Sequence, residues 1–79
     1  MPYIGSDRRQ AALQAPDTPG ELNYAMCKLA LDYVRRKGVC YTSMGDVAGA
    51  FNYANLEFYR RVVVPYEIEA TERNGDVFI

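Results

Sequence analysis

Residues 21–37 carry signals for both ends of a helix, and this constrains the fold more than any other stretch. Glu21 lies in the predicted first turn, where a carboxylate interacts favourably with the helix dipole. Three basic residues close the segment, and Gly38 follows as the expected helix breaker. Apolar residues recur at helical spacing between Leu22 and Tyr33. The sequence therefore predicts a helix over 21–37 with a buried face.

A second long helix is predicted for residues 44–64. Ser43 precedes it and Asp46 follows three residues later, an arrangement similar to a capping box. The apolar stripe of this helix is wider than the roughly 100° of an ordinary surface helix. It comprises Met44, Val47, Ala48, Phe51, Leu56, Phe58, Tyr59, Val62 and Val63. Such excess width indicates either a ligand pocket or a neighbouring subunit.

Shorter segments complete the prediction. Residues 1–20 are expected to be a weakly ordered N-terminal arm with a short helix. Pro65 suits either a kink or the first turn of a separate helix over 65–74, and Gly75 suits its end. The extended tail 75–79 is a candidate to pair with the chain start as a short two-stranded ribbon.

The short chain limits the size of its core. We expect one mainly α domain over 1–79, a compact bundle of three to four helices, and a domain near this size buries only about 60% of its unfolded surface. Small domains usually gain stability from a disulfide, a metal or a partner chain. Nearly half of the residues (49%) are hydrophobic and seven are tyrosines, which suit interfaces. A homo-oligomer is therefore predicted.

Cysteine and histidine content argues against a metal site. Cys27 and Cys40 form no CxxC motif and the chain has no histidine, so carboxylates would have to supply the remaining zinc ligands. A disulfide between the two thiols stays open, but reduced thiols in the cytoplasm are the preferred interpretation. We expect no metal and no cofactor.

Several functional classes are disfavoured by composition. A net charge of −1 argues against binding duplex nucleic acid. No apolar run approaches the roughly 20 residues that span a bilayer, so a cytoplasmic protein without membrane contact is expected. Without histidine, acid–base chemistry would fall to carboxylates or tyrosines. The sequence therefore predicts a protein that is not an enzyme.

Arg60 and Arg61 are the leading candidates for ligand binding. Their planar guanidinium groups suit phosphate or carboxylate, and Tyr59 and Tyr66 bring rings close to them. One interpretation pairs Arg61 with Glu57 four residues earlier and leaves Arg60 in solvent. The other places one arginine in a cleft beside a tyrosine, where the two hold an anionic ligand.

A second, smaller candidate set lies in the segment 21–37. Tyr24 and Lys28 are four residues apart and share a helix face, so a ring and an ammonium group can meet one ligand. Alternatively, Lys28 pairs with Asp32 and Tyr24 only packs. Tyr3, in the extended start of the chain, is a further candidate.

Four short sequence words are distributed over nearly the whole chain: MPYI at 1–4, GELNY at 20–24, LEFYRRVV at 56–63 followed by PYE at 65–67, and NGDV at 74–77. They resemble those of a family of small uncharacterised proteins found in tailed phages and in bacteria. The region before the second word departs from that pattern, because it is shorter and rich in alanine and proline.

The resemblance implies a small protein that counters a host defence. In the first hypothesis, pockets of a homo-oligomer sequester a nucleotide-like anionic signal without turnover. The contacts would come from Arg60, Arg61, Tyr59, Tyr66, Tyr24, Lys28 and Tyr3. In the alternative, the aromatic and arginine cluster is a hot spot for a host or phage protein. In a third reading, the cluster is only the subunit interface.

Overall fold

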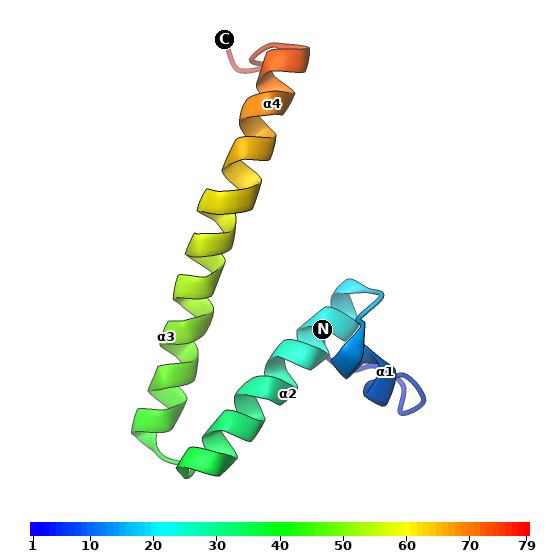
Figure 1. Cartoon of the computed structure of the whole chain (residues 1–79), viewed down its shortest axis with the longest axis vertical. Coiled ribbons are helices and arrows are strands. Elements are labelled where there is room, and N and C mark those ends of the chain that lie inside the picture. Colours follow the sequence, from blue (N-terminus) through cyan, green and yellow to red (C-terminus); the bar gives the residue numbers. More distant parts are fainter. The chain divides into compact units, whose positions relative to one another are not determined.

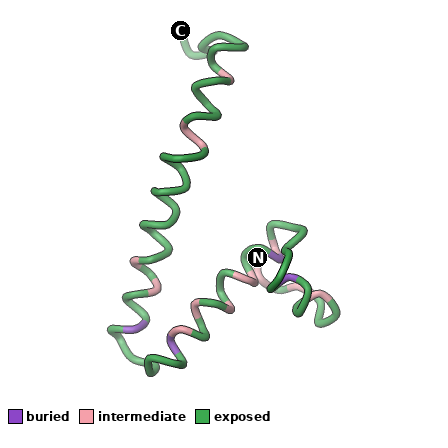
Figure 2. The backbone as a smooth tube through the Cα atoms, viewed as in Figure 1, coloured by how far each residue is buried: buried purple, intermediate pink, exposed green.

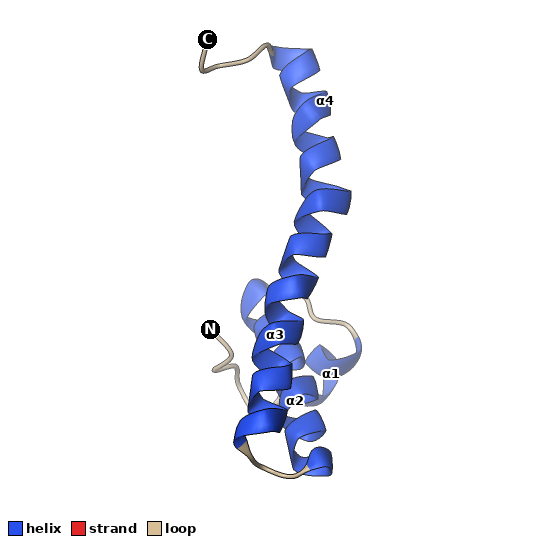
Figure 3. Cartoon of the chain, turned by 90° about the vertical axis from the view of Figure 1, so that its left-hand side faces the viewer, coloured by secondary structure: helices blue, strands red, loops and turns tan.

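The computed structural model describes residues 1–79 and consists of helices joined by short loops (Figure 1). The elements are α1 (Arg9–Gln14), α2 (Pro19–Lys37), α3 (Tyr41–Phe58), the π-helix η1 (Tyr59–Val63) and α4 (Val64–Asn74). This confirms the mainly α fold. Figure 3 contains no strand, so the terminal ribbon is not supported. No helix is both long and apolar enough to cross a membrane.

The chain divides into two units, Met1–Val47 and Ala48–Ile79. In the first unit α1 packs on α2, and the buried residues of these two helices are Ala12, Glu21 and Val34 (Figure 2). The second unit is a continuous helical stretch, made of the end of α3, η1 and α4, followed by a short tail. The expectation of a single domain stays a prediction.

Helix α2 begins two residues before the expected position because Thr18 caps it. The Thr18 hydroxyl oxygen accepts a hydrogen bond from the backbone N–H of Glu21 at 3.1 Å, and Pro19 occupies the first helical turn. The helix ends at Lys37, where Gly38 adopts a φ of 101°, a conformation that favours glycine.

Helix α3 begins three residues earlier than expected, and its cap differs from the predicted one. The buried Ser43 lies inside the helix, where its hydroxyl donates to the carbonyl oxygen of Gly38 at 2.6 Å. The Ser43 hydroxyl oxygen also accepts a hydrogen bond from the backbone N–H of Cys40 at 3.3 Å. The predicted capping box, with Ser43 just before the helix, is therefore wrong, because the helix already begins at Tyr41 and the Ser43 hydroxyl bonds the backbone of the preceding residues.

Asp46 instead connects α3 to α2 within the first unit. Its Oδ2 accepts a hydrogen bond from the Tyr33 hydroxyl at 3.2 Å. This bond and the nearby negative charge stabilise the protonated phenol, so the pKa of Tyr33 is raised. This hydrogen bond joins the first turns of α3 to the last turn and a half of α2.

The π-helix η1 allows the helix to continue through Pro65. A proline ring clashes with the carbonyl group four residues back and offers no N–H. Here the backbone N–H of Val64 bonds the carbonyl oxygen of Tyr59, five residues back, which widens the turn just before the proline. Val64 keeps helical angles (φ −61°, ψ −49°), so no break separates the two predicted helices.

The C-terminal tail forms a turn. Gly75 ends α4 with a φ of 79°, and its N–H bonds the carbonyl oxygen of Thr71 at 2.7 Å. The backbone N–H of Phe78 bonds Asp76 Oδ1 at 2.9 Å, which closes the tail on itself.

Candidate binding site

Arg60 and Arg61 share one carboxylate. Arg60 Nη2 lies 2.6 Å from Glu57 Oε1, and Arg61 Nε donates to the same oxygen. The expected pair of Arg61 with Glu57 is present, and Arg60, expected in solvent, joins it. All three side chains are at least half exposed. One positive charge of the two is thus compensated on the helix surface.

Tyr59 and Tyr66 have different partners on the same helical stretch. The Tyr59 hydroxyl donates to Glu67 Oε1 at 3.3 Å, and the Arg73 guanidinium lies 6.0 Å from the centre of the Tyr66 ring. Residues eight apart in an α-helix differ by about 80°, but the extra residue of η1 reduces this to about 20° for Tyr59 and Glu67. The polar contacts of these tyrosines are to other residues, not to each other or to the paired arginines.

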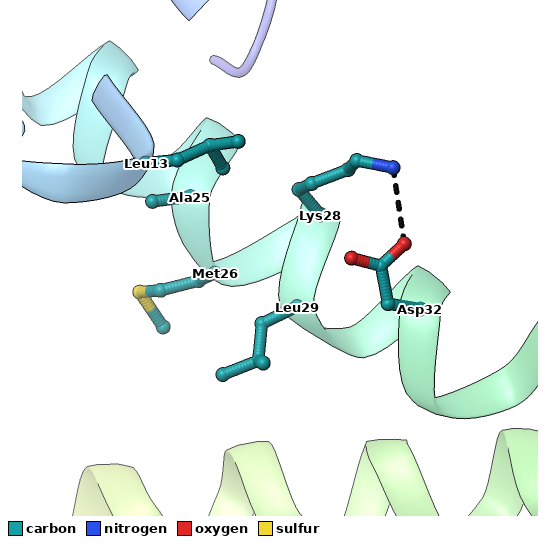
Figure 4. Close-up of a pocket in the computed structure, with 6 residues that line it drawn as sticks. All are labelled: Leu13, Ala25, Met26, Lys28, Leu29 and Asp32. Carbon is teal, nitrogen blue, oxygen red and sulfur yellow. Dashed lines mark hydrogen bonds and ion pairs between the residues drawn. The ribbon is translucent and has the colours of Figure 1, made fainter. Parts of the chain in front are cut away.

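Lys28 pairs with Asp32, as in the second of the two interpretations given for it. Its Nζ lies 3.0 Å from Asp32 Oδ1, at the edge of a hollow of about 400 Å³ (Figure 4). The apolar lining of this hollow is Leu13, Ala25, Met26 and Leu29. Tyr24 does not line this hollow, so the hollow holds only Lys28 of the two.

Tyr24 and Tyr3 come together in another hollow of about 380 Å³, formed between the chain start and the first two helices. Its lining consists of Pro2, Tyr3, Ile4, Arg9 and Tyr24. Arg9 Nε donates weakly to the carbonyl oxygen of Ile4, at 3.4 Å, and Arg9 forms no ion pair. Two tyrosines and an uncompensated guanidinium group thus line one surface.

Gly20 allows the chain start to lie against α2. A Cβ at position 20 would be 2.9 Å from the carbonyl oxygen of Met1, closer than real Cβ contacts. Glycine is therefore required there by the approach of the Met1 backbone, although Gly20 lies in a helix. This contact positions Tyr3, two residues later, beside the hollow.

A partly buried ion pair connects the residue that precedes α1 to the first turn of α2. Arg8 Nε and Nη2 donate to Glu21 Oε2 and Oε1 at 3.0 and 2.8 Å, and the N–H of Asp17 donates to Oε1 at 3.2 Å. The Arg8 hydrogen bonds and then the Asp17 N–H lower the pKa of Glu21. Arg8 is therefore engaged in ion pairs within the chain, while its neighbour Arg9 lines the hollow.

Arg9 is not among the candidate residues named from the sequence. The available signal was the T-P-G-E segment at 18–21, a capping motif with proline in the first turn. That motif places Glu21 beside the preceding loop, where an arginine such as Arg8 can reach it. The neighbouring arginine is then left without a partner.

Both cysteines are free and exposed. Cys27 Sγ lies 3.3 Å from Asn23 Oδ1, and Cys40 stands at the start of α3. The backbone N–H and the hydroxyl of Ser43 lower the pKa of the Cys40 thiol. No group of three or more histidine, cysteine, aspartate or glutamate side chains is arranged to hold a metal ion.

A comparison of the sequence with models of protein families found one match. A family model described as a domain of unknown function (DUF6899) matches residues 1–77. The chain belongs to this family. Searches of curated proteins and of solved structures returned no match. The match to the DUF6899 model includes both hollows and the segment from Glu57 to Arg73, so the candidate residues all belong to the family domain.

Proposed function

We propose that this DUF6899 protein binds a small nucleotide-like anion without catalysis, in the hollow lined by Tyr3, Arg9 and Tyr24. The observation that carries the proposal is the meeting of two tyrosine rings with an arginine that has no carboxylate partner. Aromatic rings stack on a base, and a guanidinium group holds a phosphate by paired hydrogen bonds. Of the candidates named from sequence, Tyr3 and Tyr24 keep this role.

The size of the hollow fits such a ligand. Its volume of about 380 Å³ lies within the roughly 300–1,000 Å³ of small-molecule sites. Arg60 and Arg61 are less suited, because Glu57 accepts hydrogen bonds from both. An anion at that cluster would have to compete with a carboxylate already in place.

The proposed role is sequestration. The resemblance to small phage and bacterial proteins supports a cytoplasmic protein that lowers the free concentration of a host nucleotide signal by mass action. Tight binding with no turnover is sufficient for this purpose, so no acid–base or nucleophilic residue is needed.

The test is a thermal-shift and calorimetry panel of cyclic and linear adenine and guanine nucleotides on the full chain. We expect one member to raise the melting temperature, and Arg9→Gln to weaken its binding by about tenfold or more, as for the loss of a charged hydrogen-bond donor. The matched control is Arg35→Gln, an exposed arginine outside the hollow, which should bind as wild type. No shift with any nucleotide would refute the proposal.

Gly20→Ala provides a second, geometric variant. Alanine favours the helix but displaces the backbone of Met1, so we expect unchanged or higher helicity together with weaker nucleotide binding. Circular dichroism and calorimetry on the same samples separate the two effects. Wild-type binding by Gly20→Ala would show that the position of the chain start is unimportant.

A protein-interaction module is the second candidate. The observation that favours it is the exposure of Tyr59, Tyr66 and Phe58 beside Arg60, since tyrosine and arginine are frequent in interface hot spots. A single stoichiometric partner recovered from host lysate, and lost with Arg60→Ala but not with Arg9→Gln, would support this function over nucleotide binding.

A further inference from the structure

Three aromatic side chains form a row along the second unit that the proposed function does not use. Phe51 and Phe58 are seven residues apart, and Phe58 and Tyr66 are eight apart. Seven residues of an α-helix return to within about 20° of the starting direction. The interval from Phe58 to Tyr66 is one residue longer, but it contains the π-helix η1, whose turn holds one extra residue. The three rings therefore share one side of the helix.

This row is apolar and uncovered within its unit. Phe51, Phe58 and Tyr66 are 36%, 58% and 65% exposed. Val62 continues the row at the same side and is 51% exposed. The unit Ala48–Ile79 holds no second helix, since its helical part is one continuous stretch. A row at seven-residue spacing is typical of a helix that packs on another helix.

The charged residues beside the row indicate which helix packs on it. Arg61 bonds Glu57, so both lie on one flank, and helical geometry places Glu69 on that flank also. Arg73 lies over the Tyr66 ring, next to the same row. Arg61 and Glu69 are four residues to either side of Pro65, while Glu57 and Arg73 are eight to either side. Glu57 and Glu69 thus each have a basic counterpart by reflection through Pro65.

We propose that this helix pairs antiparallel with the same helix of a second copy, with Pro65 close to the two-fold axis. In this arrangement Arg61 faces Glu69 of the second copy and Glu57 faces Arg73 of the second copy. The two-fold axis repeats both contacts. A parallel pair would set identical charges side by side, which disfavours it.

The available area indicates a weak dimer. With about 200 Å² for an aromatic side chain, the exposed surface of Phe58, Val62 and Tyr66 amounts to roughly 300 Å² per copy. Phe51 is not counted, because reflection through Pro65 sets it level with residue 79 of the second copy, beyond the end of α4 at Asn74. The stems of the flanking charged residues bring the area per copy toward the roughly 600 Å² per partner found in the smallest specific interfaces. We therefore expect association in the micromolar to millimolar range.

Sedimentation of the full chain from about 10 µM to about 1 mM tests the pairing. We expect a monomer–dimer equilibrium whose dissociation constant rises about tenfold or more with Arg61→Glu or with Glu69→Arg alone. The double variant Arg61→Glu/Glu69→Arg restores the opposite charges and should return close to wild type. A double variant as weak as the single ones overturns the antiparallel register.

Apolar variants test the face itself. Phe58→Asp should abolish dimerisation, whereas Leu56→Asp, placed on the opposite side of the helix and 62% exposed, should leave it unchanged. Circular dichroism verifies that both variants remain helical. A wild-type chain that stays monomeric at every concentration overturns the proposal. The inference does not rest on nucleotide binding, because the two sites lie in different units.

Discussion

Among single residues, Glu21 joins several segments of the first unit. It bonds both donor groups of Arg8, accepts the N–H of Asp17, and donates its own N–H to Thr18. One carboxylate thus joins the residue before α1, the loop after α1 and the first turn of α2. Its loss would leave the Arg8 guanidinium without its principal partner.

Glu21→Gln is expected to lower the melting temperature near neutral pH by a few degrees. The folded pKa of Glu21 is lowered, so its carboxylate stabilises the fold above the ordinary glutamate pKa, and this stabilisation is lost as pH falls through the lowered pKa. Melting curves should therefore separate wild type from variant above about pH 5 and converge in acid, as the pH falls through the lowered pKa of Glu21.

The matched control for this prediction is Glu72→Gln, which changes an exposed glutamate without an ion pair. It should melt as wild type at every pH. A gap between wild type and Glu21→Gln that persists unchanged into acid would show that the Arg8 contact does not depend on the charge of Glu21.

At the scale of elements, η1 determines how the two ends of the second unit are rotated about the helix axis. Pro65 stabilises the wide turn indirectly, because it cannot donate to the carbonyl group of Arg61. With Pro65→Ala that hydrogen bond becomes available, and α-helical geometry can replace the π turn.

Pro65→Ala should make the helix more stable, by up to about 3 kcal/mol, and should rotate the residues after it by about 100°. The Tyr59–Glu67 hydrogen bond is then lost and Tyr66 leaves the row of Phe51 and Phe58. Amide exchange should slow around residues 62–66 while sedimentation shows weaker dimerisation. Slower exchange with unchanged dimerisation would contradict the role of the π turn.

The helix ends that are predicted correctly are those marked by a local sequence signal. Gly38 and Gly75 end their helices as expected, because each helix requires a residue with positive φ at that point. The start of α3 was misplaced since Ser43 can cap in two registers, and only packing selects one. The π turn was missed because its hydrogen bond skips a residue without any signature beyond Pro65 itself.

For the whole molecule, the candidate sites differ in how much of their geometry can be predicted from the sequence. The Lys28–Asp32 and Arg61–Glu57 pairs are four residues apart on helices, so spacing alone predicts them. The hollow at Tyr3 and Tyr24 joins residues distant in sequence. Its formation depends on the approach of Met1 to Gly20, which no periodicity reveals.

The two proposed sites should act independently in the intact chain. Ligand binding and dimerisation each raise the melting temperature by mass action, and changes at separate sites usually add. We expect the nucleotide-induced shift to persist in Arg61→Glu, and the rise of the melting temperature with protein concentration to persist in Arg9→Gln. Differential scanning calorimetry of the four combinations measures this. Loss of both effects in one variant would instead indicate coupling between the units.

The wide turn at η1 also has a consequence for chains of different length. A π turn holds one residue more than the α turn it replaces, so a chain shortened by one residue between Tyr59 and Val63 can close the turn and keep the spacing of the row. A deletion between Phe51 and Phe58 falls in α-helix, where no extra residue is present. It would rotate one of the two rings to another side of the helix. Family members that differ in length by one residue can therefore do so at η1 without altering the surface presented by this helix.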